Sequence, residues 1–225
     1  MDKFALIGYP AKGSLSPLLF GAAYAGKYGY GFIEQQDWAQ AWKIFTEGQY
    51  LAVNVTAPHK MEAARSATWR SPEVEAIGAA NILVKTPEGI KAYNSDYLAV
   101  KDLISRHAPK ARTAVVVGFG GAGKAAFRAA VDSGLRTEVK RHSEICDGVR
   151  ADLVIFTLPK AVPGMEAIAC DTLIEANYRS PQCAELPLIG QYVSGREWLR
   201  AQAVLGYELM TGETPDSEAI GQVKI

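Results

Sequence analysis

The stretch TAVVVGFGGAG at residues 113–123 decides the fold of this chain. Its first five residues are apolar or β-branched without interruption, which indicates a strand buried on both faces, as in a parallel sheet. Glycines at GxGxxG spacing follow the strand, and the alanine-rich segment from Lys124 to Ser133 then predicts a helix. A strand, a glycine turn and a helix in this order are typical of a dinucleotide-binding unit, in which the helix N-terminus faces a pyrophosphate.

The glycine turn supplies the candidate cofactor-binding residues Gly118, Gly120, Gly121, Ala122 and Gly123. Glycines let the backbone turn tightly and approach a pyrophosphate closely. The next expected strand, residues 137–141, ends on Lys140 and Arg141 where an acid would bind a ribose 2′-OH. A basic strand end favours a 2′-phosphate, hence NADP over NAD. A turn that needs positive φ, followed by a solvated basic strand end, is the alternative interpretation.

Strand and helix signals alternate along the rest of the chain and predict an α/β protein with parallel sheets. Strands are expected at residues 4–8, 31–35, 50–55, 137–141, 152–156 and 173–176, with a hairpin at 82–93. Helices are expected after Ser16 as N-cap with Pro17 at the first helical position, after Asp37, after Asp96, and at 195–210.

One connection in this pattern is too short for a complete dinucleotide-binding domain. Ten residues, 142–151, separate the expected strands at 137–141 and 152–156. A parallel crossover with its helix needs about a dozen residues or more. We therefore expect the domain to lack one helix and one strand beside the adenine site.

Composition excludes several classes of protein. The 225 residues carry 24 Lys plus Arg and 24 Asp plus Glu without a basic block, so a nucleic-acid partner is not expected. The three cysteines form no CxxC pair, which favours a reducing cytoplasm. Neither an export signal nor an apolar run of membrane-spanning length is evident. His59 and His142 have no partners at metal-ligand spacing, so we expect no metal site.

Two charged residues are candidates for proton transfer. Lys60 lies just past the expected strand at 50–55, at the edge where open α/β sheets bind ligands. Asp96 lies at the junction between two α/β units. A lysine beside a carboxylate can exchange a proton with a substrate oxygen while the carboxylate holds it in position. Two unrelated surface charges are the alternative, and these two residues alone do not exclude it.

Short motifs occur in a fixed order over nearly the whole chain. They are Ile7-Gly8-Tyr9-Pro10, Ser14-Leu15-Ser16-Pro17, Asn54-Val55-Thr56 through Lys60, Gly78-Ala79-Ala80-Asn81, Tyr93-Asn94-Ser95-Asp96, the glycine turn, Tyr178, and Gly195 through Gln202-Ala203. Together they resemble the shikimate dehydrogenase family. The resemblance implies two α/β domains: a substrate-binding and catalytic domain at residues 1–96 plus 196–225, and a shortened Rossmann-like NADP-binding domain at 97–195. It also implies reversible NADP-dependent reduction of 3-dehydroshikimate to shikimate, in aromatic amino acid biosynthesis.

The resemblance further implies a role for each matching residue. Lys60 and Asp96 would be the catalytic pair. Ser14 and Ser16 would bind the substrate carboxylate, which agrees with the preference of anions for a helix N-terminus. The other matching positions would be Thr56, Asn81 and Gln202 for the ring hydroxyls, Tyr178 for the pocket wall, and Gly195 for the cofactor side. A solvent-facing position on its helix is the alternative for Gln202.

Three departures from the family pattern keep other functions open. Gly13 stands where the family generally has histidine, the loop at 156–159 replaces an Asn-Ala-Thr-Pro type loop, and Glu175 replaces an aspartate. A shikimate-like binding homologue with weak or no dehydrogenase activity, in which the shortened cofactor domain no longer holds NADP well, is one alternative, and a quinate dehydrogenase is another. The sequence leaves open a homodimer, the tightness of NADP binding and the direction of flux.

Overall fold

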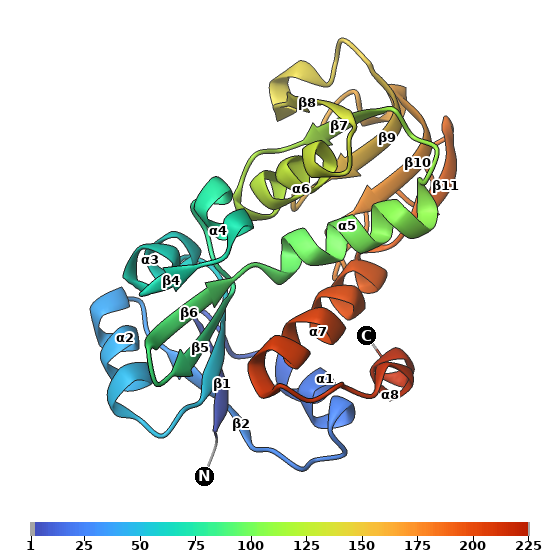
Figure 1. The fold of residues 1–225 in the computed structure, drawn as a ribbon. Coiled ribbons are helices and arrows are strands. Elements are labelled where there is room, and N and C mark those ends of the chain that lie inside the picture. The colour runs from blue at the N-terminus through green and yellow to red at the C-terminus, as the bar shows by residue number, and fades with distance from the viewer. Residues whose placement is uncertain (1–2, 225) are drawn as a thin grey trace. The chain divides into compact units, whose positions relative to one another are not determined.

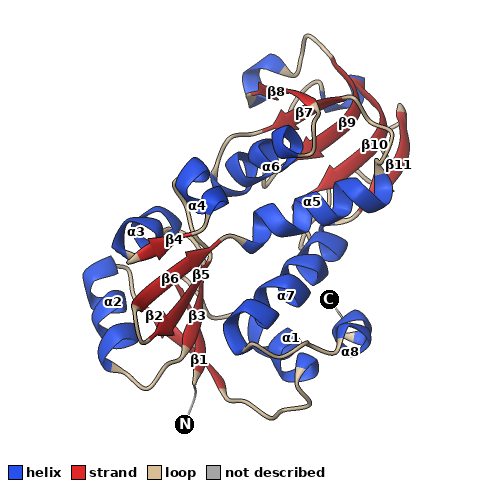
Figure 2. Cartoon of the chain, viewed as in Figure 1, coloured by secondary structure: helices blue, strands red, loops and turns tan. Residues whose placement is uncertain are grey.

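The computed structural model describes residues 3–224, which fold into two compact α/β units (Figures 1 and 2). The first unit contains residues 3–95 and 203–224, and the second contains residues 96–202. Asp96 and residues 196–202, which the sequence motifs grouped with the first domain, lie in the second unit. The two-domain α/β fold class that the sequence predicts is confirmed. None of the described helices is long and apolar enough to cross a bilayer.

Six strands form the sheet of the first unit, in the order β2-β1-β3-β5-β6-β4. Their bounds are Phe4–Gly8 (β1), Tyr30–Glu34 (β2), Ala52–Val55 (β3), Trp69–Arg70 (β4), Ile82–Thr86 (β5) and Gly89–Tyr93 (β6). β1 pairs in parallel with β2 and β3, while β5 pairs antiparallel with both β3 and β6. The sheet is therefore mixed rather than purely parallel, and β1, β3 and β6 all end at the same edge.

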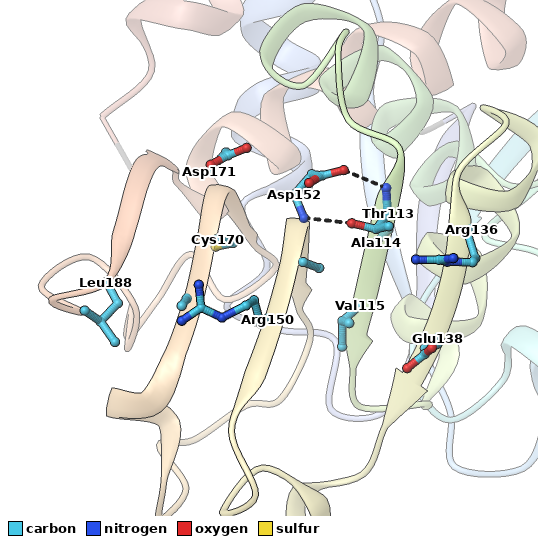
Figure 3. A pocket seen from close by; sticks show the side chains of 12 residues that line it. Thr113, Ala114, Val115, Arg136, Glu138, Arg150, Asp152, Cys170, Asp171 and Leu188 are labelled. Atoms are coloured by element: carbon cyan, nitrogen blue, oxygen red, sulfur yellow. Dashed lines mark hydrogen bonds between the residues drawn. The ribbon is translucent and has the colours of Figure 1, made fainter.

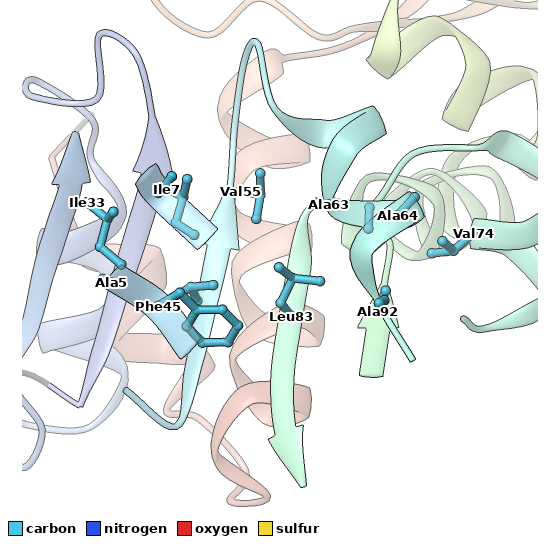
Figure 4. Packing of buried hydrophobic residues seen from close by; sticks show 14 residues of the cluster. Ala5, Ile7, Ile33, Phe45, Val55, Ala63, Ala64, Val74, Leu83 and Ala92 are labelled. Carbon is cyan, nitrogen blue, oxygen red and sulfur yellow. The ribbon is translucent and has the colours of Figure 1, made fainter. Parts of the chain in front are cut away.

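Helices cover both faces of this first sheet. One layer consists of α2 (Trp38–Glu47), α3 (Lys60–Ser66) and α4 (Pro72–Ile77), and the other of α1 (Ser16–Ala23), α8 (Ser217–Gln222) and the end of α7 (Gly195–Thr211). Phe45 of α2 is fully buried in a cluster with the strand residues Ile7 and Leu83 (Figure 4). As predicted, Asp37 caps α2, because its carboxylate accepts the N–H of Ala39 at 3.1 Å.

Five parallel strands form the sheet of the second unit, in the order β11-β10-β9-β7-β8. Their bounds are Thr113–Val117 (β7), Arg136–Lys140 (β8), Val149–Phe156 (β9), Ile168–Glu175 (β10) and Ile189–Val193 (β11), with α5 (Ser95–His107) and α6 (Gly121–Asp132) beside them. β9 and β10 begin earlier than the sequence predicts, and β11 is a strand that it misses. β11 is hard to recognise because Gly190 and Gln191 interrupt its apolar pattern.

The shortened crossover is confirmed. Between β8 and β9 the chain forms one 3₁₀ turn, His142–Glu144, and β8 is the last strand at that edge of the sheet. Within residues 3–224 the next two connections, β9 to β10 and β10 to β11, also contain no α-helix. Ile145, Met165 and Cys183, one from each connection, are instead buried in a cluster with Phe156 of β9. In a full doubly wound sheet, crossover helices cover the faces of the sheet. Here side chains from the loops cover part of one face instead.

The three cysteines differ in solvent exposure, so we expect their thiols to differ in reactivity. Cys146 is exposed, Cys170 is half-buried and Cys183 is buried. Burial raises the pKa of the Cys170 thiol to about 11, and burial, assisted by the Glu175 carboxylate, raises the pKa of Cys183 further. Because the thiolate is the reactive form, we expect an aromatic disulfide reagent at neutral pH to modify one thiol rapidly in the native protein and three after denaturation. Cys146→Ser should remove the rapid phase, and a rapid phase that survives this substitution would contradict the assignment.

Candidate active site

The loop after β1 brings Ser14 and Ser16 together. Their hydroxyl oxygens lie 3.0 Å apart and share a hydrogen bond, and the Ser16 N–H donates to the Ser14 oxygen at 3.2 Å. The expectation that Ser16 is the N-cap of α1 is wrong, because Ser16 is already the first helical residue and Leu15 occupies the N-cap position. Both serines are half-buried. Their hydroxyls are therefore available at the beginning of a helix, where the backbone dipole favours an anion.

Two phenols that the sequence motifs did not single out flank Ser16. Tyr207 donates its hydroxyl to the Ser16 carbonyl at 3.1 Å, and Tyr30 donates its hydroxyl to the Asn54 side-chain oxygen at 2.7 Å. Burial raises the pKa of both phenols, with the Ser16 hydroxyl acting in the opposite direction to a lesser extent. Both phenols therefore remain protonated donors at neutral pH. Tyr207 could not be singled out from sequence because its helical spacing is equally typical of a core residue.

Thr56 and Lys60 follow β3 at the edge where β1 also ends. The Thr56 N–H donates to the Ile7 carbonyl at 2.9 Å, which ties the two strand ends together. Lys60 is the first residue of α3 and is half-buried. His59, beside it, is buried, and its Nε2 lies 2.7 Å from the Gln35 carbonyl. The residues described hold no group of three or more His, Cys, Asp or Glu side chains that could bind a metal ion.

Asn81 joins several chain segments at this same edge. Its side-chain oxygen accepts the Ser95 N–H at 2.7 Å, and its side-chain nitrogen donates to the Ser95 hydroxyl at 3.0 Å. Its backbone carbonyl accepts the Val55 N–H at 2.8 Å. Asn81 is therefore held rigidly where β3 ends and β5 begins. Asp96, the next residue after Ser95, is the second residue of α5 and is buried.

The glycines in the glycine turn of the second unit differ in why glycine stands at each position. Gly118 has a φ of +92°, and a Cβ on Gly123 would lie 2.3 Å from the Gly118 carbonyl oxygen, so backbone geometry alone explains both residues. Gly120 is different, because its φ is −75° and a Cβ there would meet no atom within 4 Å. Gly120 is exposed at the N-cap of α6, where no protein atom fills the space beside its Cα. Gly121 and Ala122 begin α6.

Lys140 and Arg141 lie next to this turn. The Gly118 N–H donates to the Lys140 carbonyl at 2.9 Å. Arg141 follows the last strand of the sheet, is exposed, and has its N–H bonded to the Glu144 carboxylate at 2.6 Å. The basic strand end and the glycine turn are therefore adjacent, as a dinucleotide with a 2′-phosphate would require.

Tyr178 and Gly195 meet at the carboxyl edge of the second sheet. Tyr178 is half-buried in the loop that follows β10. A Cβ on Gly195 would lie 2.6 Å from the Tyr178 nitrogen and 2.5 Å from the Asn177 carbonyl carbon. Close backbone packing therefore accounts for glycine at position 195. Gln202 lies on α7 and is half-buried.

A separate hollow of about 510 Å³ lies at the opposite edge of the second sheet (Figure 3). It is lined by residues near the amino ends of β7 to β10, among them Arg136, Arg150 and Asp152. Asp152 accepts the N–H groups of Arg112 and Thr113 at 2.8 and 2.9 Å, and these hydrogen bonds lower the pKa of its carboxyl group. Ligands in open α/β sheets bind at the carboxyl edge, so this hollow is not part of the candidate site.

Known proteins resemble this chain in sequence and in fold. Residues 6–83 match the model of the shikimate dehydrogenase substrate binding domain. A shikimate dehydrogenase (NADP(+)) of Caldivirga maquilingensis is 31% identical over 150 residues, covering 60% of this chain and 52% of the relative. One of Anaeromyxobacter sp. (strain K) is 31% identical over 182 residues, covering 75% of this chain and 61% of the relative. The chain thus spans about half to three-fifths of the length of these curated relatives.

Solved structures extend the likeness in fold to the whole chain. The shikimate 5-dehydrogenase of Thermus thermophilus, solved in complex with NADP(H) and shikimate, superposes with a TM-score of 0.84. The match covers 98% of this chain and 97% of that one at 22% sequence identity. The fold is therefore shared, and the domain match and the sequence relatives confirm the resemblance that the motifs indicate. The chain is thus similar to shikimate dehydrogenases in sequence, over 75% of its length for the Anaeromyxobacter relative, and in fold over 98% of its length for the Thermus structure.

Proposed function

We propose that this chain is an NADP-dependent oxidoreductase that reversibly reduces 3-dehydroshikimate to shikimate. The observation that carries the proposal is the gathering of polar side chains at one edge of the first sheet: Ser14 and Ser16 after β1, Thr56 and Lys60 after β3, and Asn81 before β5. These residues are far apart in sequence and bring hydroxyl, ammonium and amide groups to the same edge of one sheet. A polyhydroxylated ring with a carboxylate needs such a set of donors and acceptors.

Ser14 and Ser16 would bind the substrate carboxylate. Their hydroxyls stand at the beginning of α1, and Tyr207 holds the Ser16 backbone in place through its carbonyl. Thr56, Asn81 and Gln202 would contact ring hydroxyls in this proposal, and Tyr178 would line the pocket. Hydrogen bonds from hydroxyls to a charged carboxylate are stronger than those between neutral groups, so the serines would contribute most to orienting the acid.

Lys60 and Asp96 would move the proton of the reacting alcohol. Lys60 stands at the first position of α3, where the helix dipole favours acids, so helix formation gives no reason for a lysine there. A residue that breaks a local rule at a ligand-binding edge is expected at functional sites. Lys60 would give a proton to the carbonyl oxygen during reduction and take it back during oxidation, while Asp96 holds the ammonium group in position.

The second unit would hold the dinucleotide. NADP(H) supplies or accepts the hydride in this reaction class. The open space above Gly120 would admit the pyrophosphate, and Lys140 with Arg141 would contact the 2′-phosphate. Because the sheet ends at β8, little protein is left to enclose the adenosine, and apolar contact is worth about 25 cal/mol per Å² buried. NADP is therefore expected to bind in preference to NAD but weakly.

A spectrophotometric assay tests the proposed function. The purified protein is mixed with NADP⁺ and shikimate, and the formation of NADPH is followed, with quinate and NAD⁺ as comparison substrates. We expect faster turnover with shikimate than with quinate, and with NADP⁺ than with NAD⁺. Calorimetric binding of shikimate without any turnover would instead identify a binding homologue. Faster turnover of quinate would identify a quinate dehydrogenase.

The proposal also includes the cellular compartment, the type of partner and the oligomeric state of the enzyme. A reducing cytoplasm agrees with three cysteines that remain thiols. A balance of 24 basic and 24 acidic residues favours a small-molecule substrate over nucleic acid. Sedimentation equilibrium would decide between a monomer and a homodimer.

Replacing Arg141 by alanine is expected to remove most of the preference for NADP. A guanidinium group can pair with a 2′-phosphate through two parallel hydrogen bonds, and each hydrogen bond to a charged group is worth roughly 1.5–3 kcal/mol. Because Arg141 is exposed, we count one such hydrogen bond only: the dissociation constant for NADP should rise about tenfold to hundredfold, while that for NAD stays nearly unchanged. The measurement is calorimetric titration of both cofactors into wild type and variant.

Arg150→Ala is the matched control for this titration. Arg150 is an exposed arginine of the same sheet, but it lies near the amino end of β9. The Arg150→Ala variant should bind NADP and NAD with the same affinities as the wild type. Equal wild-type affinities for NADP and NAD would contradict the role of Arg141, and tight NADP binding would contradict the expected loss of contacts around the adenosine.

A further inference from the structure

Glu175 is a carboxylate with no solvent exposure. It is the last residue of β10, and its exposed fraction is 0%. An ionised carboxylate is very unfavourable in the protein interior unless hydrogen bonds replace its hydration. The groups that donate hydrogen bonds to the Glu175 carboxylate therefore indicate the role of this side chain.

Three donors from two segments satisfy the Glu175 carboxylate. Its Oε1 accepts the Gln182 N–H at 2.7 Å. Its Oε2 accepts the Cys183 N–H at 3.3 Å and the Tyr192 hydroxyl at 2.6 Å. Burial, and then the hydrogen bond to Glu175, raise the pKa of Tyr192, so its phenol stays a donor. One side chain thus joins the end of β10, the following loop and β11.

The loop closed in this way is also fixed from within. The Asn177 side-chain oxygen accepts the N–H groups of Arg179 and Ser180 at 3.2 and 3.1 Å. The Asn177 side-chain nitrogen donates to the carbonyls of Ser180 at 2.8 Å and Pro159 at 3.0 Å. Since Pro159 belongs to the connection after β9, the loops at the ends of β9 and β10 are tied together.

Tyr178 lies between these two anchors. Asn177 precedes it, and the segment that Glu175 holds follows it, so the backbone that carries Tyr178 is held on both sides. The Arg179 guanidinium lies 5.6 Å from the centre of that ring, within cation–π range. All of this occurs at the carboxyl edge of a parallel sheet, the edge at which such sheets bind ligands.

We propose that Glu175 is a positioning residue, which clamps the loop of residues 176–183 and thereby fixes Tyr178 at the carboxyl edge of the second sheet. The clamp follows from the contacts within the second unit, whereas its effect on turnover rests on the proposed function. Glu175 does not touch the substrate in this proposal. It acts through the backbone of Gln182 and Cys183, and Tyr192 acts with it.

The experiment combines hydrogen exchange with steady-state kinetics on the full chain. In Glu175→Gln the new side-chain nitrogen donates and cannot accept, so at least one of the three donors loses its partner. We expect the amides of residues 182 and 183 to exchange about tenfold faster or more than in wild type. A misplacement of about 1 Å can lower turnover about 10²-fold, so kcat/KM for shikimate should fall at least tenfold. The Kd of NADP, measured by calorimetry, should change less than about twofold, since the glycine turn is untouched.

Two further variants separate positioning from general stability. Tyr192→Phe keeps both backbone hydrogen bonds to Glu175, so it should show smaller changes of the same kind and still fold if Glu175→Gln does not. Asp152→Asn is the matched control, because this carboxylate also accepts two backbone N–H groups, but at the amino edge of the same sheet. It should speed exchange at Arg112 and Thr113 and leave kcat and KM unchanged.

The two readouts distinguish failure of the clamp from failure of the function. Unchanged exchange at residues 182 and 183 in both Glu175→Gln and Tyr192→Phe would overturn the clamp, whatever the enzyme does. Faster exchange with unchanged kcat/KM would overturn the positioning role. An equal loss of kcat/KM in Asp152→Asn would also overturn it, since general destabilisation would then explain the loss. Absence of turnover in wild type would contradict the proposed function, and the exchange experiment would still decide the clamp.

Discussion

Lys60→Ala is expected to lower kcat about 10²-fold or more, with a smaller change in the KM for shikimate. General acid–base assistance acts mainly on the transition state, so its loss appears in kcat rather than in binding. Lys60 is well placed for this role because it is half-buried at the first position of α3, directly after the end of β3. The measurement is steady-state kinetics in both reaction directions.

Asp96→Asn should produce a loss of similar size, because the amide cannot hold an ammonium group as a carboxylate does. Lys43→Ala is the matched control, since Lys43 is an exposed lysine on α2 and should leave kcat unchanged. Normal turnover in both Lys60→Ala and Asp96→Asn would show that the catalytic pair is misassigned. The double variant should lose little more than either single variant if the two side chains act as one unit.

Replacing both Ser14 and Ser16 by alanine is expected to weaken shikimate binding strongly. Each hydrogen bond to a charged group is worth roughly 1.5–3 kcal/mol, so the dissociation constant should rise by a factor of about 10² or more. Helix α1 should persist, because Leu15 rather than Ser16 is its N-cap and Tyr207 still holds the Ser16 carbonyl. The measurement is calorimetric titration of shikimate and of an analogue that lacks the carboxylate.

The analogue is the internal control for this pair of serines. Without a carboxylate it should bind the wild type weakly and lose little further affinity in the variant. Equal losses for shikimate and for the analogue would show that the two hydroxyls serve the local structure of the loop before α1 and not an anion. A thermal melt of the variant, compared with wild type, would show how much of any loss comes from the fold.

Local sequence determined the elements whose cause is also local. The run of β-branched residues at 113–117 formed a buried strand, and the turn at 86–89 joined two antiparallel strands. Asp37 capped the helix that it precedes, since an N-cap depends on a residue two or three positions ahead. The shortened crossover was also predictable, because chain length sets a hard limit on what can connect two parallel strands.

Tertiary contacts determined the structure of the segments whose local sequence indicates something different. Ser16 before Pro17 has the sequence of an N-cap, yet Ser16 lies inside the helix, and Tyr207, 191 residues away, donates the hydrogen bond that fixes its carbonyl. β11 has a weak strand pattern and forms because β10 offers it a parallel partner. The mixed first sheet arises because β5 returns antiparallel beside β3, a pairing that alternation of strands and helices does not specify.

The candidate site also contains features that local sequence indicates and features that only tertiary contacts explain. The spacing of the glycine turn marks it as a candidate cofactor site from sequence alone, whereas Ser14 and Lys60 became candidates through the resemblance to the shikimate dehydrogenase family. The contrast between Gly120, which faces open space, and Gly195, which close packing requires, became evident from the folded chain, because a missing side chain has no signature in sequence. The tertiary structure also decided that Glu175 is buried and satisfied by residues up to 17 positions away. A carboxylate loses its water only when folding brings such donors to it, and that cannot be inferred from its immediate neighbours.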